Sequence, residues 1–148
     1  MNNNIINIED VKENWLRWNP IPGLAKKYYL TELLHNITAG FIIEMLNEDN
    51  QKVGVKIVFA EAVLAYRYTE ESLPQFTVHY LRAKYEEEFY SAWCLFKIEN
   101  STYLKWITEE SYGIYDDIKL THFCILTSDQ RLDIIVGYEP EVTLFTAK

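Results

Sequence analysis

The sequence has 148 residues and a mass of 17.5 kDa, a length that suits one domain spanning residues 1–148 around a single core. Its 22 acidic and 14 basic side chains give a net charge of −8, so we expect neither nucleic acid nor an anionic membrane to bind the surface as a whole. A hydrophobic share of 49% and an aromatic share of 15% exclude a disordered chain, because such a sequence buries enough apolar surface to fold.

The first residues and the two cysteines favour a reduced, cytoplasmic protein. Glu9 and Asp10 come before any apolar run of signal-peptide length, and no segment has the roughly 18 uninterrupted apolar residues of a membrane span. Cys94 and Cys124 each lie in an apolar stretch, where a free thiol behaves as a small buried side chain. We therefore expect no disulfide framework.

The N-terminal quarter of the chain predicts one helix and one ambiguous segment. Apolar residues recur at helical spacing from Ile8 to Trp18, which predicts a short helix that ends before Pro20. Residues 24–37 fit both a helical stripe and a strand face, and we favour a strand.

A two-residue apolar period predicts that most of the remaining chain forms strands. The strand candidates are residues 41–45, 55–59, 63–68, 76–80, 89–98, 122–126, 132–136 and 142–145. Segment 89–98 is apolar on both faces, which predicts a central place in the sheet. A second helix is predicted over residues 101–110, with Asn100 as its N-cap. Because most connections are short, we predict an α+β fold: a mostly antiparallel, curved β-sheet with two helices packed against it.

Histidine and cysteine give one candidate metal site. His122 and Cys124 share a strand face and would bind a metal if Cys94 and either His35 or His79 completed a tetrahedron. The paired spacings typical of zinc sites are missing from the sequence, so we favour structural cysteines and expect no metal or other cofactor. The five glycines never cluster, which argues against a phosphate-binding loop.

Carboxylates are numerous, and most are expected to be solvated. Residues 86–88 are three consecutive glutamates, and neighbours on a strand point to opposite faces, so they do not converge on one site. Asp133 interrupts the apolar stretch 132–136, where its charge must either face water or be paired. The two-residue period favours an outward-facing Asp133.

The segment between the second helix and the next strand is the best candidate for binding a partner. It combines Tyr112 and Tyr115 with Asp116 and Asp117 around a flexible glycine. Tyrosine supplies a large contact area, and carboxylates favour encounter with a Lys- or Arg-rich surface. We therefore predict these four residues to be partner-binding.

Two parts of the chain resemble small acidic bacterial proteins that act as immunity partners of polymorphic toxins. They are the stretch FAEAVLAYRYTEE at residues 59–71 and the tail from Glu99 to Glu141. The resemblance implies a non-enzymatic protein that inhibits its cognate toxin by binding it. It assigns no role to an individual residue.

The sequence thus favours a non-enzymatic, cytoplasmic protein-binding domain whose partner is a basic toxin domain, because a charge of −8 accompanies no catalytic constellation. The alternative is a small enzyme or ligand-binding domain with a cavity in the curved sheet, where Asp133, His122 and Tyr138 would supply the polar groups. A third alternative is a self-associating structural protein, and the oligomeric state stays open.

Overall fold

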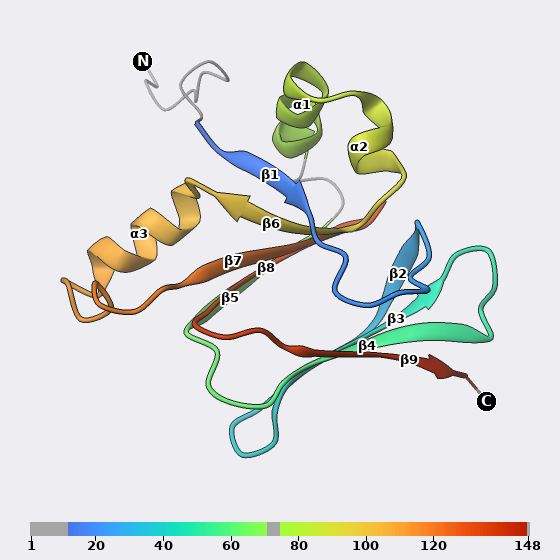
Figure 1. Ribbon diagram of the computed structural model, residues 1–148, viewed down its shortest axis with the longest axis horizontal. Helices are drawn as coiled ribbons and strands as arrows, with labels where there is room; N and C mark the ends of the chain where they lie inside the picture. Colours follow the sequence, from blue (N-terminus) through green and yellow to red (C-terminus); the bar gives the residue numbers. More distant parts are fainter. Residues whose placement is uncertain (1–11, 71–74, 148) are drawn as a thin grey trace.

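The structure of this chain, a computed structural model, describes residues 12–70 and 75–147. In these residues nine strands form two antiparallel sheets, and three helices lie outside them (Figure 1). The strands are β1 (Asn14–Arg17), β2 (Tyr28–Asn36), β3 (Gly40–Asn47), β4 (Val53–Phe59), β5 (Ala65–Glu70), β6 (Leu95–Glu99), β7 (Thr121–Leu126), β8 (Gln130–Val136) and β9 (Glu141–Thr146), and the helices are α1 (Gln75–Lys84), α2 (Glu87–Ser91) and α3 (Thr102–Glu110). The predicted α+β class with antiparallel strands is confirmed.

The strands divide between two sheets, where the sequence predicted one curved sheet. One sheet has the order β1-β6-β7-β8-β5 and the other the order β2-β3-β4-β9. The hairpins β2–β3, β3–β4 and β7–β8 are local, but β1–β6, β5–β8 and β4–β9 join strands that lie far apart in the chain. Local patterns do not reveal such distant pairings, which is why the division into two sheets was not predicted.

The two sheets pack against each other around one hydrophobic core. Phe123 of β7 lies at its centre, with its ring centroid 5.9 Å from that of Phe59 on β4 and 4.7 Å from that of Trp18. Alternate residues of β3 and β4 are fully buried on the same side, as expected for strands with one face in a core.

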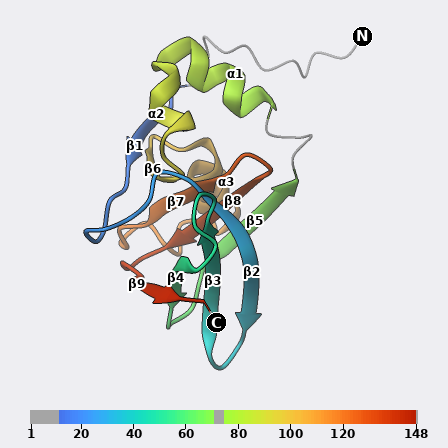
Figure 2. The ribbon, with the colours of Figure 1, turned by 90° about the vertical axis from the view of Figure 1, so that its right-hand side faces the viewer.

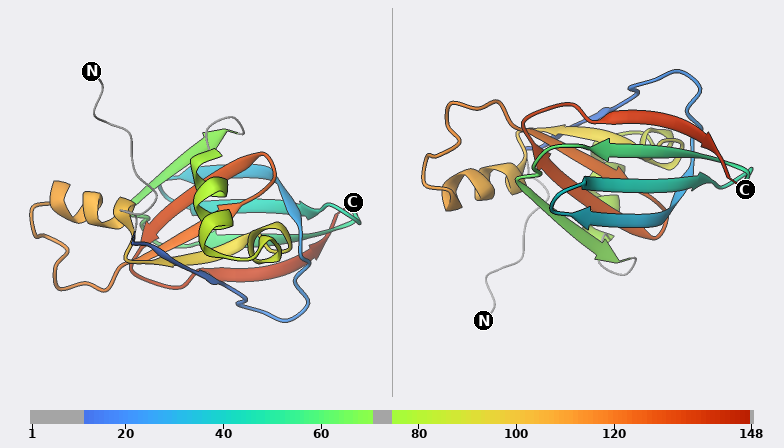
Figure 3. Two further views of the ribbon diagram at one scale, coloured as in Figure 1. Left: turned by 90° about the horizontal axis from the view of Figure 1, so that it is seen from above. Right: turned by 90° about the horizontal axis from the view of Figure 1, so that it is seen from below.

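The opposite face of the five-stranded sheet is covered by α1 and α2, which the view from above shows lying across its strands (Figure 3). Phe89 of α2 packs on Phe96 of β6, with 5.3 Å between ring centroids, and Thr77 of α1 accepts a hydrogen bond from Arg131 of β8. This sheet is therefore buried on both faces, and β8 is buried continuously from Leu132 to Val136. None of the described helices is long and apolar enough to cross a membrane.

The predicted first helix is wrong where the structure describes it. Residues 14–17 form β1, which pairs with β6 so that Trp15 lies opposite Ile98. Trp15 packs in the helix-covered layer, whereas Trp18, beyond the strand end, packs on Phe123 between the sheets. The spacing of the two tryptophans resembles a helical stripe, but each contacts a different layer. The part of the prediction before residue 12 lies outside the described residues.

Two further strand predictions need correction. Residues 76–80 belong to α1, because Thr77, Tyr80 and Leu81 are buried at the three- and four-residue spacing of one helix face. Residues 89–98 divide between α2 and β6: Phe89 packs on Phe96 in the helix-covered layer, and β6 buries both Leu95 and Phe96 because its sheet is covered on both faces. The central place predicted for this segment is confirmed for β6, which lies between β1 and β7.

The remaining elements are confirmed with small shifts of their ends. Residues 24–37 contain the strand β2, and the two predicted hairpins are β3–β4 and β7–β8. The N-cap of α3 is Ser101 rather than Asn100, since the Ser101 hydroxyl oxygen accepts a hydrogen bond from the Leu104 amide at 2.9 Å. Asn100 instead donates to the Lys12 carbonyl at 2.9 Å.

Candidate functional site

The segment from α3 to β7, residues 102–120, projects beyond the sheets at one end of the molecule, and we call it the α3–β7 lobe (Figure 1, Figure 3). Four of its large apolar side chains are exposed: Trp106 by 54%, Tyr112 by 95%, Ile114 by 75% and Ile118 by 50%. Several large exposed apolar side chains within one short segment are typical of an interaction surface.

The tip of the lobe is a series of tight turns. Successive backbone hydrogen bonds link Ile114 to Ser111, Asp116 to Gly113 and Ile118 to Tyr115 at 3.1–3.3 Å. Tyr112 has a φ of 54° and Gly113 a φ of 87°, so two consecutive residues adopt the left-handed region. Glycine suits that region, but a tyrosine there is unfavourable by about 1–2 kcal/mol. The almost fully exposed ring of Tyr112 provides no packing that offsets this strain.

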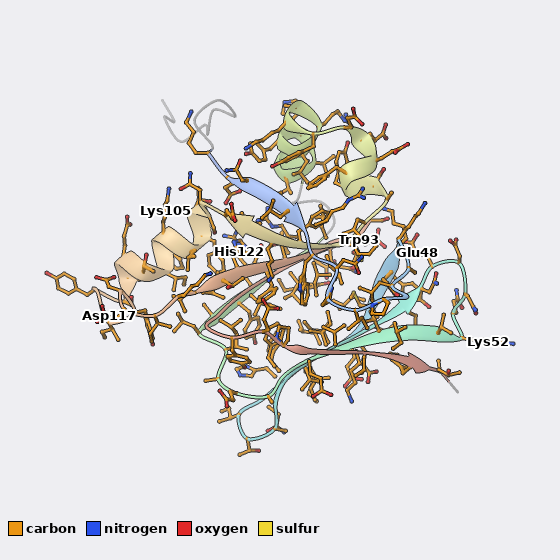
Figure 4. All side chains as sticks on the ribbon, viewed as in Figure 1. Glu48, Lys52, Trp93, Lys105, Asp117 and His122 are labelled. Atoms are coloured by element: carbon orange, nitrogen blue, oxygen red, sulfur yellow. The ribbon has the colours of Figure 1, made fainter. Side chains whose placement is uncertain are left out.

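The charge of the tip is negative. Glu109, Glu110, Asp116 and Asp117 are exposed, and residues 109–117 contain no lysine or arginine. Figure 4 shows Asp117 near the outer end of the lobe, whereas His122 lies in the sheet on β7. The tip therefore presents four exposed carboxylates to a cationic surface, and the exposed lysines of the lobe, Lys105 and Lys119, flank them.

The structure places the four sequence-predicted binding residues together at this tip. Tyr112, Asp116 and Asp117 are exposed and Tyr115 is half-buried. Their role in binding stays a prediction. Sequence reasoning did not select Trp106, Ile114 or Ile118 for binding.

The lobe is attached to the core by a chain of buried polar side chains at the N-terminus of α3. The Ser101 oxygen lies 2.6 Å from His122 Nδ1, and His122 Nε2 lies 2.7 Å from Asp133 Oδ1. Because Asp133 accepts from Nε2, a neutral His122 has its single N–H there, and Ser101 donates its hydroxyl proton to Nδ1. The same Ser101 oxygen accepts from Leu104, so every bonding group of the cap is engaged.

Asp133 is the centre of this chain. Besides His122 it accepts hydrogen bonds from Arg67 Nε at 2.8 Å and Arg131 Nε at 3.0 Å, and its side chain is 0% exposed. The expectation of an outward-facing Asp133 is therefore wrong. The residue does face away from the inter-sheet core, but α1 and Tyr103 in the first turn of α3 pack on that side, and the carboxylate is paired there.

Glu13 forms a second attachment of the lobe. Its carboxylate accepts from the Thr102 amide at 2.9 Å and the Thr102 hydroxyl at 3.1 Å, so a negative charge lies at the helix N-terminus, where it is stabilising. The Glu13 carbonyl also accepts from Tyr80 and Lys84 of α1. Glu13, which directly precedes β1, thereby connects α1 with α3.

Ser101, His122 and Asp133 are the residue types of a hydrolytic triad, but the serine bonds to Nδ1 and the aspartate to Nε2, the reverse of the triad arrangement. The surroundings are those of a structural network. The three residues are 2%, 1% and 0% exposed, and the serine oxygen is the N-cap of α3. Tyr138, the third polar group of the ligand-binding alternative, bonds to Glu61 instead. Pockets of about 340, 130 and 240 Å³ lie elsewhere, and Ser101, His122 and Asp133 line none of these three.

The candidate metal site considered in the sequence does not assemble among the described residues, although His122 and Cys124 share a strand face. Cys94 and Cys124 are buried free thiols, and no group of three metal-ligating side chains occurs within residues 12–70 and 75–147. Burial raises the pKa of the Cys94 thiol to about 12 and raises the pKa of Cys124 well above its ordinary value. Both thiols are therefore protonated and unreactive at neutral pH.

Burial lowers the pKa of His122. The hydrogen bond to Asp133 raises this pKa but is outweighed by burial. Arg131 lowers the pKa further, and Glu13 raises it weakly. A histidine with a lowered folded pKa stabilises the native state fully above its unfolded pKa of about 6.5 and loses that contribution as pH falls. We expect the free energy of unfolding, measured with urea from pH 8 to pH 5, to decrease below about pH 6.5. The decrease should be smaller in His122→Gln, and equal slopes in both proteins would contradict this assignment.

Comparison with known proteins gives no relative: no protein-family model, curated protein or solved structure matches this chain.

Proposed function

We propose that this chain is a non-enzymatic protein-binding domain that acts as an immunity protein, inhibiting a cognate bacterial toxin by covering a basic surface with the α3–β7 lobe. The observation that carries the proposal is the projecting tip, where exposed aromatic and aliphatic side chains stand among four carboxylates. Aromatic anchors supply most of the binding energy of protein interfaces, and complementary charge speeds encounter.

The attachment of the lobe supports a binding role. Its helix begins at a cap whose hydroxyl is bonded to His122, and Arg67 lies over the ring of Tyr103 on α3 at 4.1 Å. These contacts hold α3 in one orientation before a partner arrives. A preordered surface loses less conformational entropy on binding, so more of its contact energy appears as affinity.

The conformation of Tyr112 also supports the proposal. A residue kept at positive φ without packing of its own is a cost to the folded chain, and such strain concentrates at functional positions. A partner that buries the Tyr112 ring would recover that cost in the complex.

We expect the gene immediately upstream of the one for this chain to encode a toxin, and the test uses the product of that gene. Co-expression should restore the growth of cells that produce that toxin, and the purified proteins should bind each other. Ile114→Ala and Tyr112→Ala should each weaken the affinity about 5- to 30-fold, because an anchor of an interface contributes about 1–2 kcal/mol.

The matched control is Ile37→Ala, since Ile37 is 96% exposed at the distant β2–β3 turn. It should leave affinity and rescue unchanged. Reversing the charges of Asp116 and Asp117 to lysine should slow association and flatten its dependence on salt. Failure of rescue, or equal affinities of the Ile114 and Ile37 variants, would refute the proposal.

A further inference from the structure

One edge strand of each sheet, β2 and β5, lies beside the other. Figure 2 and the right-hand view of Figure 3 show β2 and β5 neighbouring each other and running in opposite directions. Within the described residues β2 pairs only with β3, and β5 only with β8. Each strand therefore has one edge without a strand partner. Such edges are templates for an additional strand.

The space between these edges is partly closed by aromatic rings and partly open. At one end Tyr66 of β5 contacts His35 and Phe41, with 5.4 and 4.6 Å between ring centroids. Farther along lies an open pocket of about 240 Å³. It is lined by Leu30, Thr31, Glu32, Leu33, Tyr68 and Gln130. Tyr66 and Tyr68 are each 39% exposed, so this β2–β5 groove presents aromatic and aliphatic surface between two strand edges.

The charges around the groove are negative. Glu32 lines the pocket, and Glu70 accepts a hydrogen bond from the Tyr68 hydroxyl at 2.8 Å. The hydrogen bond to Glu70 raises the pKa of the Tyr68 hydroxyl, and the charge of Asp129, in the turn before β8, acts in the same direction.

Two cations of the adjoining strands do not offset these carboxylates. Arg67 and Arg131 bond to Asp133 on the opposite face of the sheet, because alternate residues of a strand point to opposite sides. The groove side of β5 thus keeps its acidic character although the strand contains an arginine.

We infer that the β2–β5 groove binds an extended, Lys- or Arg-bearing segment of a partner protein by strand addition. The segment's backbone would bond to a strand edge, its inward side chains would contact Tyr66, Tyr68 and Leu33, and its cations would meet Glu32 and Glu70. A second copy of this chain is a poorer occupant, because it brings a net charge of −8. The inference concerns a surface other than the lobe and does not rest on the proposed function.

The test uses a fluorescein-labelled nine-residue peptide of alternating lysine and valine, with the glutamate–valine peptide as its counterpart. We expect saturable binding of the lysine peptide at moderate salt and none of the glutamate peptide. Amide chemical shifts should change in residues 28–36 and 65–70. Glu32→Lys with Glu70→Lys should weaken binding about tenfold or more, since two attractive charge pairs become repulsive.

The matched control is Glu48→Lys with Asp49→Lys, which makes the same change in net charge at the exposed β3–β4 turn. It should alter affinity by no more than about twofold, which is all that the change in overall charge contributes. Circular dichroism and thermal unfolding verify that both double variants are folded.

Equal weakening in the two double variants, or shift changes confined to other surfaces, would overturn the inference. So would binding of the glutamate peptide. Sedimentation that shows a dimer with shift changes along β5 would identify a second copy as the occupant and also overturn it. Since the lobe variants leave this groove intact, failure here and failure of the proposed function are separate results.

Discussion

Replacing Asp133 with alanine is expected to lower the free energy of unfolding by about 3–5 kcal/mol, the usual effect of removing one partner from a buried ion pair. Asp133 accepts hydrogen bonds from His122, Arg67 and Arg131. Without it, Arg131, whose side chain is only 12% exposed, keeps its charge in a nearly dry environment. Urea unfolding at pH 7 measures the change.

The same substitution should loosen α3, because His122 would lose the acceptor that holds its ring and its tautomer toward Ser101. Hydrogen exchange should become faster in the first turn of α3. Asp117→Ala is the control: it removes an exposed carboxylate and should change stability by less than about 0.5 kcal/mol. A loss below about 1 kcal/mol in Asp133→Ala would show that the network contributes little beyond its packing.

Replacing Phe123 with alanine is expected to cost about 3–5 kcal/mol, the usual range for a buried aromatic ring. Its ring is 1% exposed and contacts Trp18 and Phe59, so its removal leaves a cavity where the two sheets meet. Thermal or urea unfolding measures the loss of stability.

Tyr112→Ala is the matched control for Phe123, since it removes a ring of similar size that is 95% exposed. Its effect on stability should stay within about 0.5 kcal/mol. Comparable losses in the two variants would contradict the placement of Phe123 at the centre of the core.

The burial of Asp133 could not be predicted from the sequence. From the sequence, a carboxylate in an alternating strand faces water, and Asp133 does point away from the inter-sheet core. α1 and the first turn of α3 pack on that face and make it a buried position. The helix α1 was not predicted, because the alternation of residues 76, 78 and 80 fits a strand as well as residues 77, 80 and 81 fit a helix.

The sequence by itself determined what depends on neighbours along the chain. The β3–β4 and β7–β8 hairpins follow from alternating apolar residues joined by polar turns, and the exposed acidic tip follows from two tyrosines and two aspartates around Gly113. His122 and Cys124 share a strand face because a strand has a two-residue period.

Only the tertiary structure decided which of these elements meet. The register that places Cys124 opposite Asp133, and Asp133 opposite Arg67, brings three strands to one carboxylate. The pairing of β1 with β6 turned an apparent helix into a strand and placed Glu13 at the start of α3. Pairings between distant segments depend on how all layers pack together, and that energy is a property of the assembled fold rather than of a local stretch of residues.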